Sequence, residues 1–226
     1  LVETLKSNAS AVRLRGLTMH IGSLLFDLGA LKQALEKVCA VHRALVKRGF
    51  ALDRIDVGGG LGIRYDTDDT TEELAMLATY GKMVRETLAT ELGDLSSLEV
   101  LAEPGRMIVG RAGLLVSEVQ YIKRAPAKTF VIVDTGMHHL LRPALYGAKH
   151  RVLPLKVSTH ARQTYDVVGP ICESSDVLAK NVELGEIHEG ELVAFADAGA
   201  YGFAMANTYN AHELPDEVVI AGAKVV

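Results

Sequence analysis

Short apolar runs alternate with long amphipathic segments through the first half of the chain. The opening residues resemble the end of a helix, and residues 15–19 form a short, mostly apolar run that predicts a strand. Between Asp27 and Arg48, leucine and valine recur at intervals of three and four residues, and Gly49 follows. This spacing predicts an amphipathic helix that ends at Gly49.

A second strand and helix follow, and then a third strand. Residues 52–57 predict a buried strand, and residues 98–102 predict another. Between them, Thr70 and Glu73 fit a capping box at the start of the second helix. One face of that helix is predicted to carry its apolar residues, which are Leu74, Leu77, Val84, Leu88 and Leu92.

Each of these three predicted strands stops at a polar or glycine-rich motif. The motifs are His20-Ile-Gly-Ser23, Gly58-Gly59-Gly60-Leu-Gly62 and Glu103-Pro104-Gly105-Arg106. Strands that alternate with helices are typical of βα units on a parallel sheet, in which the carboxyl ends of the strands carry the functional residues. We therefore expect the three motifs at one edge of a parallel sheet.

Beyond about residue 112 the pattern changes to short valine-rich runs separated by glycine, proline and aspartate. The runs that predict strands are residues 113–123, 129–133, 164–168, 191–195 and 217–220. Most of them have no long helical segment between them. We therefore predict a mostly antiparallel β structure, with a boundary near residues 109–113.

Composition narrows the classes of function. The 226 residues include 24 Lys and Arg against 28 Asp and Glu, a net charge of −4, which excludes a basic stripe for nucleic acid. No run approaches the roughly 18 apolar residues that span a bilayer. Cys39 and Cys172 lack the spacing of a disulfide framework or a zinc site, so we expect a reduced, cytoplasmic protein.

Taken singly, the motifs of the first half are also compatible with purely structural roles. The glycine run could turn its amides toward a phosphate, or could simply make a tight strand-to-helix turn, since it matches neither a dinucleotide fingerprint nor a P-loop. His20 could be packed or catalytic. Glu103 at a strand end needs a cation if it is buried, and Arg106 could supply one in a purely structural ion pair.

The motifs of the second half are equally open. Arg142-Pro-Ala-Leu-Tyr146 could clamp a carboxylate or belong to an ordinary loop. Gly169-Pro-Ile-Cys172-Glu173-Ser-Ser-Asp176 places a thiol beside a carboxylate, although a lone cysteine is usually an inert small hydrophobe. Gly199-Ala-Tyr201-Gly202 suits a turn or a phosphate contact. The histidines lack paired ligand spacing, so we assign no metal.

In their order along the chain, these six motifs resemble those of the fold-type III pyridoxal-phosphate decarboxylases, and the resemblance covers essentially the whole sequence. It implies that residues 1–111 are the later βα units of an alanine-racemase-like (β/α)8 barrel that binds pyridoxal 5'-phosphate. It also implies that residues 112–226 are a mostly antiparallel C-terminal β domain, incomplete at its end.

The resemblance implies a role for each motif in holding the cofactor. His20 would stack on the pyridine ring, and Glu103, in the Glu103-Pro104-Gly105-Arg106 turn, would pair with the pyridine nitrogen. A protonated nitrogen lets the ring accept the electron pair that CO₂ leaves behind. Related alanine racemases use an arginine there, so Glu103 favours decarboxylation. The phosphate would be held by Ser23, Gly58, Gly59, Gly60 and Tyr201.

The resemblance also implies the substrate. Arg106, Arg142 and Tyr146 would bind its distal carboxylate with help from Tyr201, Glu173 would bind its distal ammonium, and Cys172 would protonate the carbanion. Ornithine decarboxylases typically have Cys-Asp in this loop, whereas a diaminodicarboxylic acid needs a longer acid and arginines. The implied reaction converts meso-2,6-diaminopimelate to L-lysine and CO₂, in a homodimer whose Cys-Glu loops reach the partner's site.

Some features depart from the family pattern. Leu24 replaces the usual glutamine, His138-His139 replace the usual Asn-Asp, and residues 207–210 only approximate the usual approach to Tyr-Asn. The Lys-Ala-Asn motif that forms the internal Schiff base does not occur; Lys6-Ser-Asn8 is a faint echo. We expect that lysine in a segment upstream of this sequence.

Two alternatives stay open. The chain could belong to a decarboxylase of another basic amino acid, such as ornithine, arginine or carboxynorspermidine. It could also be a non-catalytic homologue with a role in dimerisation or regulation. The retained Glu103, Cys172, Glu173 and Tyr201 oppose the second alternative, and the missing lysine motif favours it.

Overall fold

The computed structural model describes residues 2–8, 10–156 and 161–225. The chain divides into two compact units. We call residues 1–64 with 69–107 the helical unit, and residues 65–68 with 108–226 the sheet unit. The sheet unit therefore takes Tyr65–Asp68 from within the sequence of the helical unit.

The helical unit contains a small parallel sheet in the order β1 (Gly16–Thr18), β2 (Arg54–Asp56), β3 (Glu99–Leu101). Leu17 pairs with Ile55, and Ile55 pairs with Val100. Each strand is shorter than the apolar run that predicted it. The parallel arrangement is confirmed, so all three strands end at the same edge.

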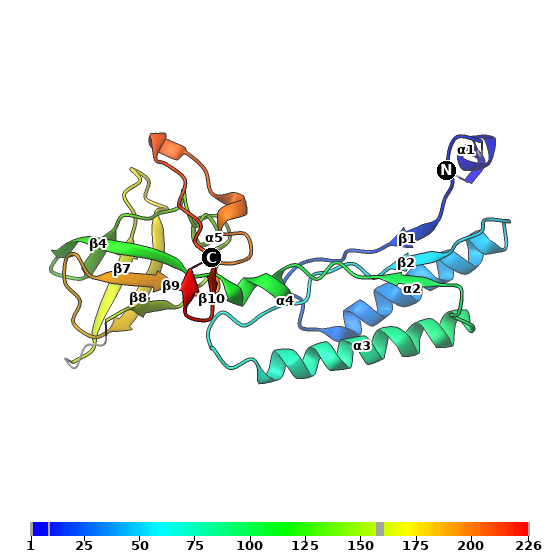
Figure 1. Ribbon diagram of the computed structural model, residues 1–226, viewed down its shortest axis with the longest axis horizontal. Helices are drawn as coiled ribbons and strands as arrows, with labels where there is room; N and C mark the ends of the chain where they lie inside the picture. The colour runs from blue at the N-terminus through cyan, green and yellow to red at the C-terminus, as the bar shows by residue number, and fades with distance from the viewer. Residues whose placement is uncertain (1, 9, 157–160, 226) are drawn as a thin grey trace. The chain divides into compact units, whose positions relative to one another are not determined.

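Two long helices cover this sheet and supply most of its core. α2 (Leu28–Val46) confirms the first predicted helix and begins after Asp27, whose side chain accepts a hydrogen bond from the Gly29 amide. α3 (Thr71–Leu92) runs beside it, and Figure 1 shows both helices along one face of the strands. The buried core of this unit includes Leu31, Leu35, Ile55, Val84 and Leu88. A short helix, α1 (Val2–Ser7), confirms the helical opening of the chain.

Two predictions about α3 are wrong. Leu74 is 62% exposed and Leu77 is also exposed, because the buried ridge passes through Tyr80, Val84 and Leu88. At about 100° per residue, Leu74 lies about 120° around the helix from Tyr80.

The capping box at α3 is also absent. The Thr70 side chain caps no amide, and the Glu73 carboxylate instead accepts a hydrogen bond from the Arg64 amide at 2.6 Å. The Asp69 carboxylate accepts from the Thr71 amide at 2.9 Å. The start of the helix is therefore fixed by Asp69, one residue earlier than predicted.

The second part of the sheet unit begins within α4 (Arg106–Val109), continues through η1 (Gly110–Ala112) and is built on six strands. Their order is β6 (Val152–Pro154), β9 (Leu192–Phe195), β4 (Leu115–Arg124), β5 (Thr129–Val133), β7 (Gln163–Val168), β8 (Val177–Leu184). The pair β5 and β7 is parallel and the other neighbours are antiparallel, which confirms a mostly antiparallel sheet. The edge strands β6 and β8 contact each other, so the sheet is nearly closed.

Most predicted strands of this unit are confirmed, but β6 and β8 were not predicted. The strand expected at 217–220 is wrong except at its end, because only Ile220 joins the small hairpin of β10 (Ile220–Ala221) and β11 (Lys224–Val225). Three short helices complete the unit: α5 (Arg142–Tyr146), η2 (Phe203–Met205) and η3 (Tyr209–Ala211).

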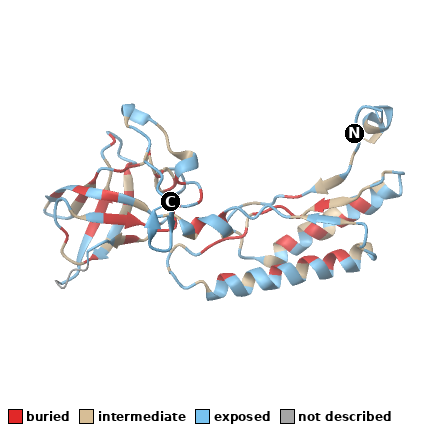
Figure 2. Cartoon of the chain, in the orientation of Figure 1, coloured by how far each residue is buried: buried red, intermediate tan, exposed pale blue. Residues whose placement is uncertain are grey.

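Buried residues lie on the facing sides of α2 and α3 in the helical unit and along the strands of the sheet unit, as Figure 2 shows. In the sheet unit, Val119, Val131, Tyr165, Val193 and Phe195 form the centre of a separate hydrophobic core. Every helix in the described part of the chain is too short or too polar to cross a membrane.

Candidate active site

Three strand ends of the helical unit converge on the glycine run. A Cβ atom would lie 2.0, 2.1 or 2.1 Å from a backbone oxygen at Gly58, Gly59 and Gly60, the oxygens being those of Met19, Glu103 and Gly22 respectively. Gly58 and Gly60 also have positive φ values of 69° and 98°. Only glycine lets the three motifs approach so closely, so His20, Ser23 and Glu103 are carried to one place.

The amides of this loop differ in their hydrogen bonds. The Gly58 amide donates to the Asp56 carboxylate at 2.8 Å, and the Gly58 carbonyl accepts from the Glu103 amide at 2.9 Å. Within the described residues, the amides of Gly59 and Gly60 donate no hydrogen bond. These two amides can therefore receive an anion, whereas that of Gly58 holds the turn.

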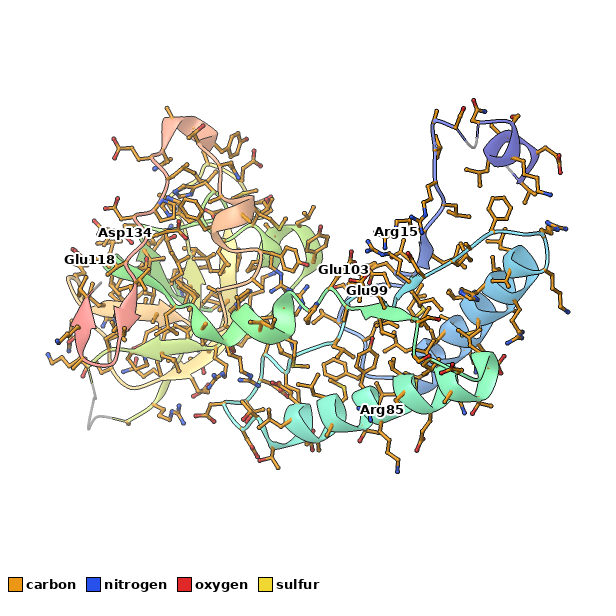
Figure 3. The ribbon with its side chains drawn as sticks, turned by 45° about the vertical axis from the view of Figure 1, so that its right-hand side comes forward. Arg15, Arg85, Glu99, Glu103, Glu118 and Asp134 are labelled. Carbon is orange, nitrogen blue, oxygen red and sulfur yellow. The ribbon has the colours of Figure 1, made fainter. Side chains whose placement is uncertain are left out.

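The side chains around the loop are of two kinds. His20, Ser23 and Glu103 are exposed, and Figure 3 shows Glu103 beyond the end of β3, the strand that begins at Glu99. Arg106 is buried, and its Nη2 donates to Ser23 Oγ at 3.0 Å. Because the Ser23 oxygen accepts from a cation, its own proton can be donated elsewhere. Glu103 does not need a cation to offset burial, since it is exposed.

In the sheet unit, Asp176 anchors the loop that carries Cys172 and Glu173. Asp176 is 3% exposed, and its carboxylate accepts hydrogen bonds from the amides of Met137 at 2.6 Å and Ile171 at 2.7 Å. Burial raises the pKa of this carboxyl, and the two amides only partly oppose the rise. Cys172 and Glu173 remain exposed at the tip of the loop.

Glu173 is held by a tyrosine from another segment. The Tyr209 hydroxyl donates to Glu173 Oε1 at 2.6 Å. That hydrogen bond, followed by the negative charge of Glu173, raises the pKa of the Tyr209 phenol. Tyr209 is therefore a neutral donor at ordinary pH.

Arg142 belongs to a buried cluster. It is 3% exposed, its Nη1 donates to His150 Nε2 at 3.0 Å, and its guanidinium carbon lies 4.7 Å from the centre of the Tyr65 ring. His150 Nδ1 then donates to the Ala196 carbonyl at 2.8 Å and the imidazole stands edge-on to Tyr65. His150 and Tyr65 thus fix the orientation of the Arg142 guanidinium. Tyr146, one turn later, is exposed.

Tyr201 sits in a constrained turn. Its φ of 60° is in the left-handed region, which is uncommon for a tyrosine. The flanking glycines are required by close packing, since a Cβ would lie 1.9 Å from Val109 O at Gly199 and 2.2 Å from Ala198 O at Gly202. The Tyr201 ring is exposed, so this strained turn holds it outward.

Three histidines gather next to the Asp176 loop. His138 is completely buried, and its ring centre lies 3.7 Å from that of His139 and 4.6 Å from that of His212. Burial, followed by the two neighbouring histidines, lowers the pKa of His138 to about 4. His139 Nε2 donates to the Glu213 carbonyl at 2.8 Å. In the described part of the chain, no group of three or more His, Cys, Asp or Glu residues is arranged to hold a metal.

The predicted site residues thus form two sets. His20, Ser23, the glycine run, Glu103 and Arg106 are brought together in the helical unit. Cys172 and Glu173 lie on one loop of the sheet unit. Arg142, Tyr146 and Tyr201 lie elsewhere in the same unit.

Comparison with known families decides the relationship. The model of the pyridoxal-dependent decarboxylase C-terminal sheet domain matches residues 23–199. The chain belongs to the pyridoxal-dependent decarboxylases. Membership implies a pyridoxal cofactor, and the structural neighbours are fold-type III decarboxylases, to which the nearly closed mixed sheet corresponds.

Two curated relatives are both named diaminopimelate decarboxylase. The chain is 43% identical over 92% of its length to that of Pseudomonas fluorescens, and 38% identical over 93% to that of Aquifex aeolicus. The chain spans about half the length of these relatives, 47% and 48% respectively.

Solved structures agree with those names. Helicobacter pylori diaminopimelate decarboxylase complexed with L-lysine matches 100% of this chain with a TM-score of 0.87 and 35% identity, and the chain covers 54% of it. Lysine/ornithine decarboxylase from Vibrio vulnificus matches 94% of the chain with a TM-score of 0.80 and 26% identity, 56% of that protein being covered.

The sequence did not indicate several residues that shape this site. Tyr65, under Arg142, had no signal, because the contact joins segments far apart in the sequence. Asp176 and Tyr209 lay within motifs but had no assigned role. A carboxylate one residue before a valine-rich run was the available signal for Asp176 as a loop anchor.

Proposed function

We propose that the full-length protein is a cytoplasmic, pyridoxal-phosphate-dependent decarboxylase that converts meso-2,6-diaminopimelate to L-lysine and CO₂. The observation that carries the substrate assignment is the exposed Glu173 carboxylate beside Cys172, fixed by Tyr209 at 2.6 Å. A fixed acid suits a substrate with a second ammonium group. The names of the relatives support the same assignment.

The residues of the helical unit fit the cofactor. We propose that residues 1–111 supply later βα units of a (β/α)8 barrel and that residues 112–226 form its partner β domain. The amides of Gly59 and Gly60, together with the Ser23 proton, would bind the phosphate, with Gly58 shaping the turn and Tyr201 adding a hydroxyl. His20 would cover the ring.

The exposed Glu103, in the turn that continues through Pro104 and Gly105 to Arg106, would hold a proton on the pyridine nitrogen. When bound, the cofactor supplies an electron sink for the pair released as CO₂ leaves. Arg106, already donating to Ser23, would stabilise the same region electrostatically.

The sheet unit would supply the substrate contacts. The Cys172 thiol, exposed at its loop, would give its proton to the carbon that lost CO₂. Arg142 and Tyr146, assisted by Arg106 and Tyr201, would bind the distal carboxylate, and Glu173 the distal ammonium. We propose a homodimer in which the Cys172-Glu173 loop of one copy completes the site of the other.

The decisive experiment measures CO₂ release by the full-length protein with pyridoxal phosphate. We expect turnover of meso-diaminopimelate and little of ornithine, arginine or carboxynorspermidine. Glu173→Asp is expected to lower kcat/KM for meso-diaminopimelate, because the shorter acid moves its carboxylate back toward the loop. Unchanged substrate preference in that variant would contradict the role of Glu173.

Faster turnover of ornithine, arginine or carboxynorspermidine than of meso-diaminopimelate would identify that amino acid as the substrate. No turnover of any of these amino acids, with a stable fold, would favour a non-catalytic homologue.

A further inference from the structure

Glu173 lies on a loop whose backbone is fixed but whose tip is exposed. Asp176 anchors the base of the loop through the Ile171 amide, and the Glu173 amide donates to the Ile171 carbonyl at 2.7 Å. The Glu173 side chain extends from this tip into solvent. In the described part of the chain, Tyr209 is the residue that donates a hydrogen bond to its carboxylate.

Tyr209 is itself held from both sides. Its amide donates to Asn207 Oδ1 at 3.1 Å, and the Asn207 amide donates to the His138 carbonyl at 2.8 Å. After Tyr209, the chain bends through two left-handed residues, Asn210 and Ala211, with φ of 55° and 61°. The bend brings His212 onto His138, with ring centres 4.6 Å apart.

One turn of the sheet unit therefore fixes both partners. This turn, residues 134–139, is tied to β4 because the Asp134 carboxylate accepts from the Glu118 amide at 2.9 Å; both side chains are labelled in Figure 3. Its Met137 amide binds Asp176 at the base of the Glu173 loop, and its His138 holds the segment of Tyr209. The Tyr209 phenol and the Glu173 carboxylate are therefore both oriented by residues 134–139.

We propose that Tyr209 is a positioning residue that fixes the Glu173 carboxylate for the distal ammonium of the substrate, an inference that rests on the proposed function. The phenol donates to Oε1, so Oε2 is left to accept from an ammonium group. An exposed glutamate must otherwise lose rotamer freedom when substrate binds. Tyr209 imposes that order beforehand, and it does so as a neutral donor that leaves the negative charge on Glu173.

The test uses full-length holoenzyme and compares Tyr209→Phe with wild type. Removing a hydrogen bond to a charged group is expected to raise KM for meso-diaminopimelate about tenfold while kcat changes less than about twofold. The matched control is Tyr121→Phe, which removes an exposed phenol from β4 and is expected to leave both parameters unchanged.

Calorimetric binding of two ligands separates positioning from a general loss of structure. The distal ammonium of meso-diaminopimelate corresponds to the α-ammonium of L-lysine. 6-Aminohexanoate lacks this α-ammonium but keeps the terminal amine and the carboxylate. Tyr209→Phe should weaken L-lysine binding about tenfold and leave 6-aminohexanoate unchanged. Equal weakening of both ligands, or of neither, would overturn the proposal.

A double-mutant cycle tests whether Tyr209 acts through Glu173. In the Glu173→Gln background, Tyr209→Phe should change KM by less than about twofold, because the oriented carboxylate is already gone. A full tenfold effect in that background would overturn the proposal. Wild type that binds both ligands but releases no CO₂ from meso-diaminopimelate would reject the proposed function, and the ligand comparison would still decide the role of Tyr209.

Discussion

Replacing Asp176 should loosen the loop that carries Cys172 and Glu173. Asp176→Ala leaves the Ile171 amide, which is buried, and the Met137 amide, which is partly buried, without their acceptor. Each orphaned donor costs about 1–3 kcal/mol. The variant also no longer buries a carboxyl whose pKa is raised, which offsets part of that loss. We expect a net destabilisation of the sheet unit of about 3 kcal/mol.

Asp176→Asn keeps one acceptor oxygen and the shape of the side chain, so about half of that loss is expected. It also removes a pH dependence. Because the folded pKa of Asp176 is raised, the stability it contributes is present below the ordinary pKa of 3.8 and is lost as pH rises through the folded value. The Asn variant should lack this slope.

Hydrogen exchange of peptides from β7 and β8 in the full-length protein measures this effect, because global unfolding of a chain with two units is not a single transition. The control is Asp216→Ala, an exposed carboxylate in the same unit, which should change protection by less than about 0.5 kcal/mol. If the amides of β7 and β8 are as well protected from exchange in Asp176→Ala as in wild type, the assignment of Asp176 as the loop anchor is refuted.

Further predictions concern packing, titration and thiol access. Gly58→Ala should destabilise the helical unit by about 3 kcal/mol, measured by hydrogen exchange of its peptides, whereas Gly81→Ala in open space on α3 should stabilise it by about 0.5–1 kcal/mol. His138, whose folded pKa is about 4, contributes stability above its ordinary pKa of 6.5 that is lost as pH falls toward 4. The loss should reach about 3 kcal/mol and disappear in His138→Asn, and an unchanged acid profile would contradict the titration. Native iodoacetamide treatment followed by mass spectrometry should label exposed Cys172 and spare buried Cys39, whose thiol pKa burial raises; equal labelling rates would argue against the described burial.

The local spacing of apolar residues predicted those helices and strands whose sequences follow it. The spacing of apolar residues in α2 and the short apolar runs of β5 and β7 gave nearly correct bounds. β8 was not predicted because Lys180 and Asn181 interrupt its apolar pattern. Asn181 also has a positive φ of 54°, at the point where the register with β7 shifts. The face of α3 was misjudged because the leucines at its start do not follow the ridge that packs on α2.

The candidate site divides in the same way. Motifs at strand ends located His20, Ser23 and Glu103, because a parallel sheet places all its carboxyl ends at one edge. The parallel pairing of β5 with β7 has no local signal, and neither has the contact of Tyr209 with Glu173, 36 positions away. Such partners depend on how strands are ordered, which spacing within one strand does not encode.

The excursion of Tyr65–Asp68 into the sheet unit constrains how this chain can be recombined with its relatives. A chimaera joined once, after Met107, would take Tyr65 from one parent and Arg142 and His150 from the other. The ring stacked under the guanidinium would then meet partners it had not evolved with. Exchange of the sheet unit therefore needs two further crossovers, around residues 65–68, for the buried cluster to be inherited whole.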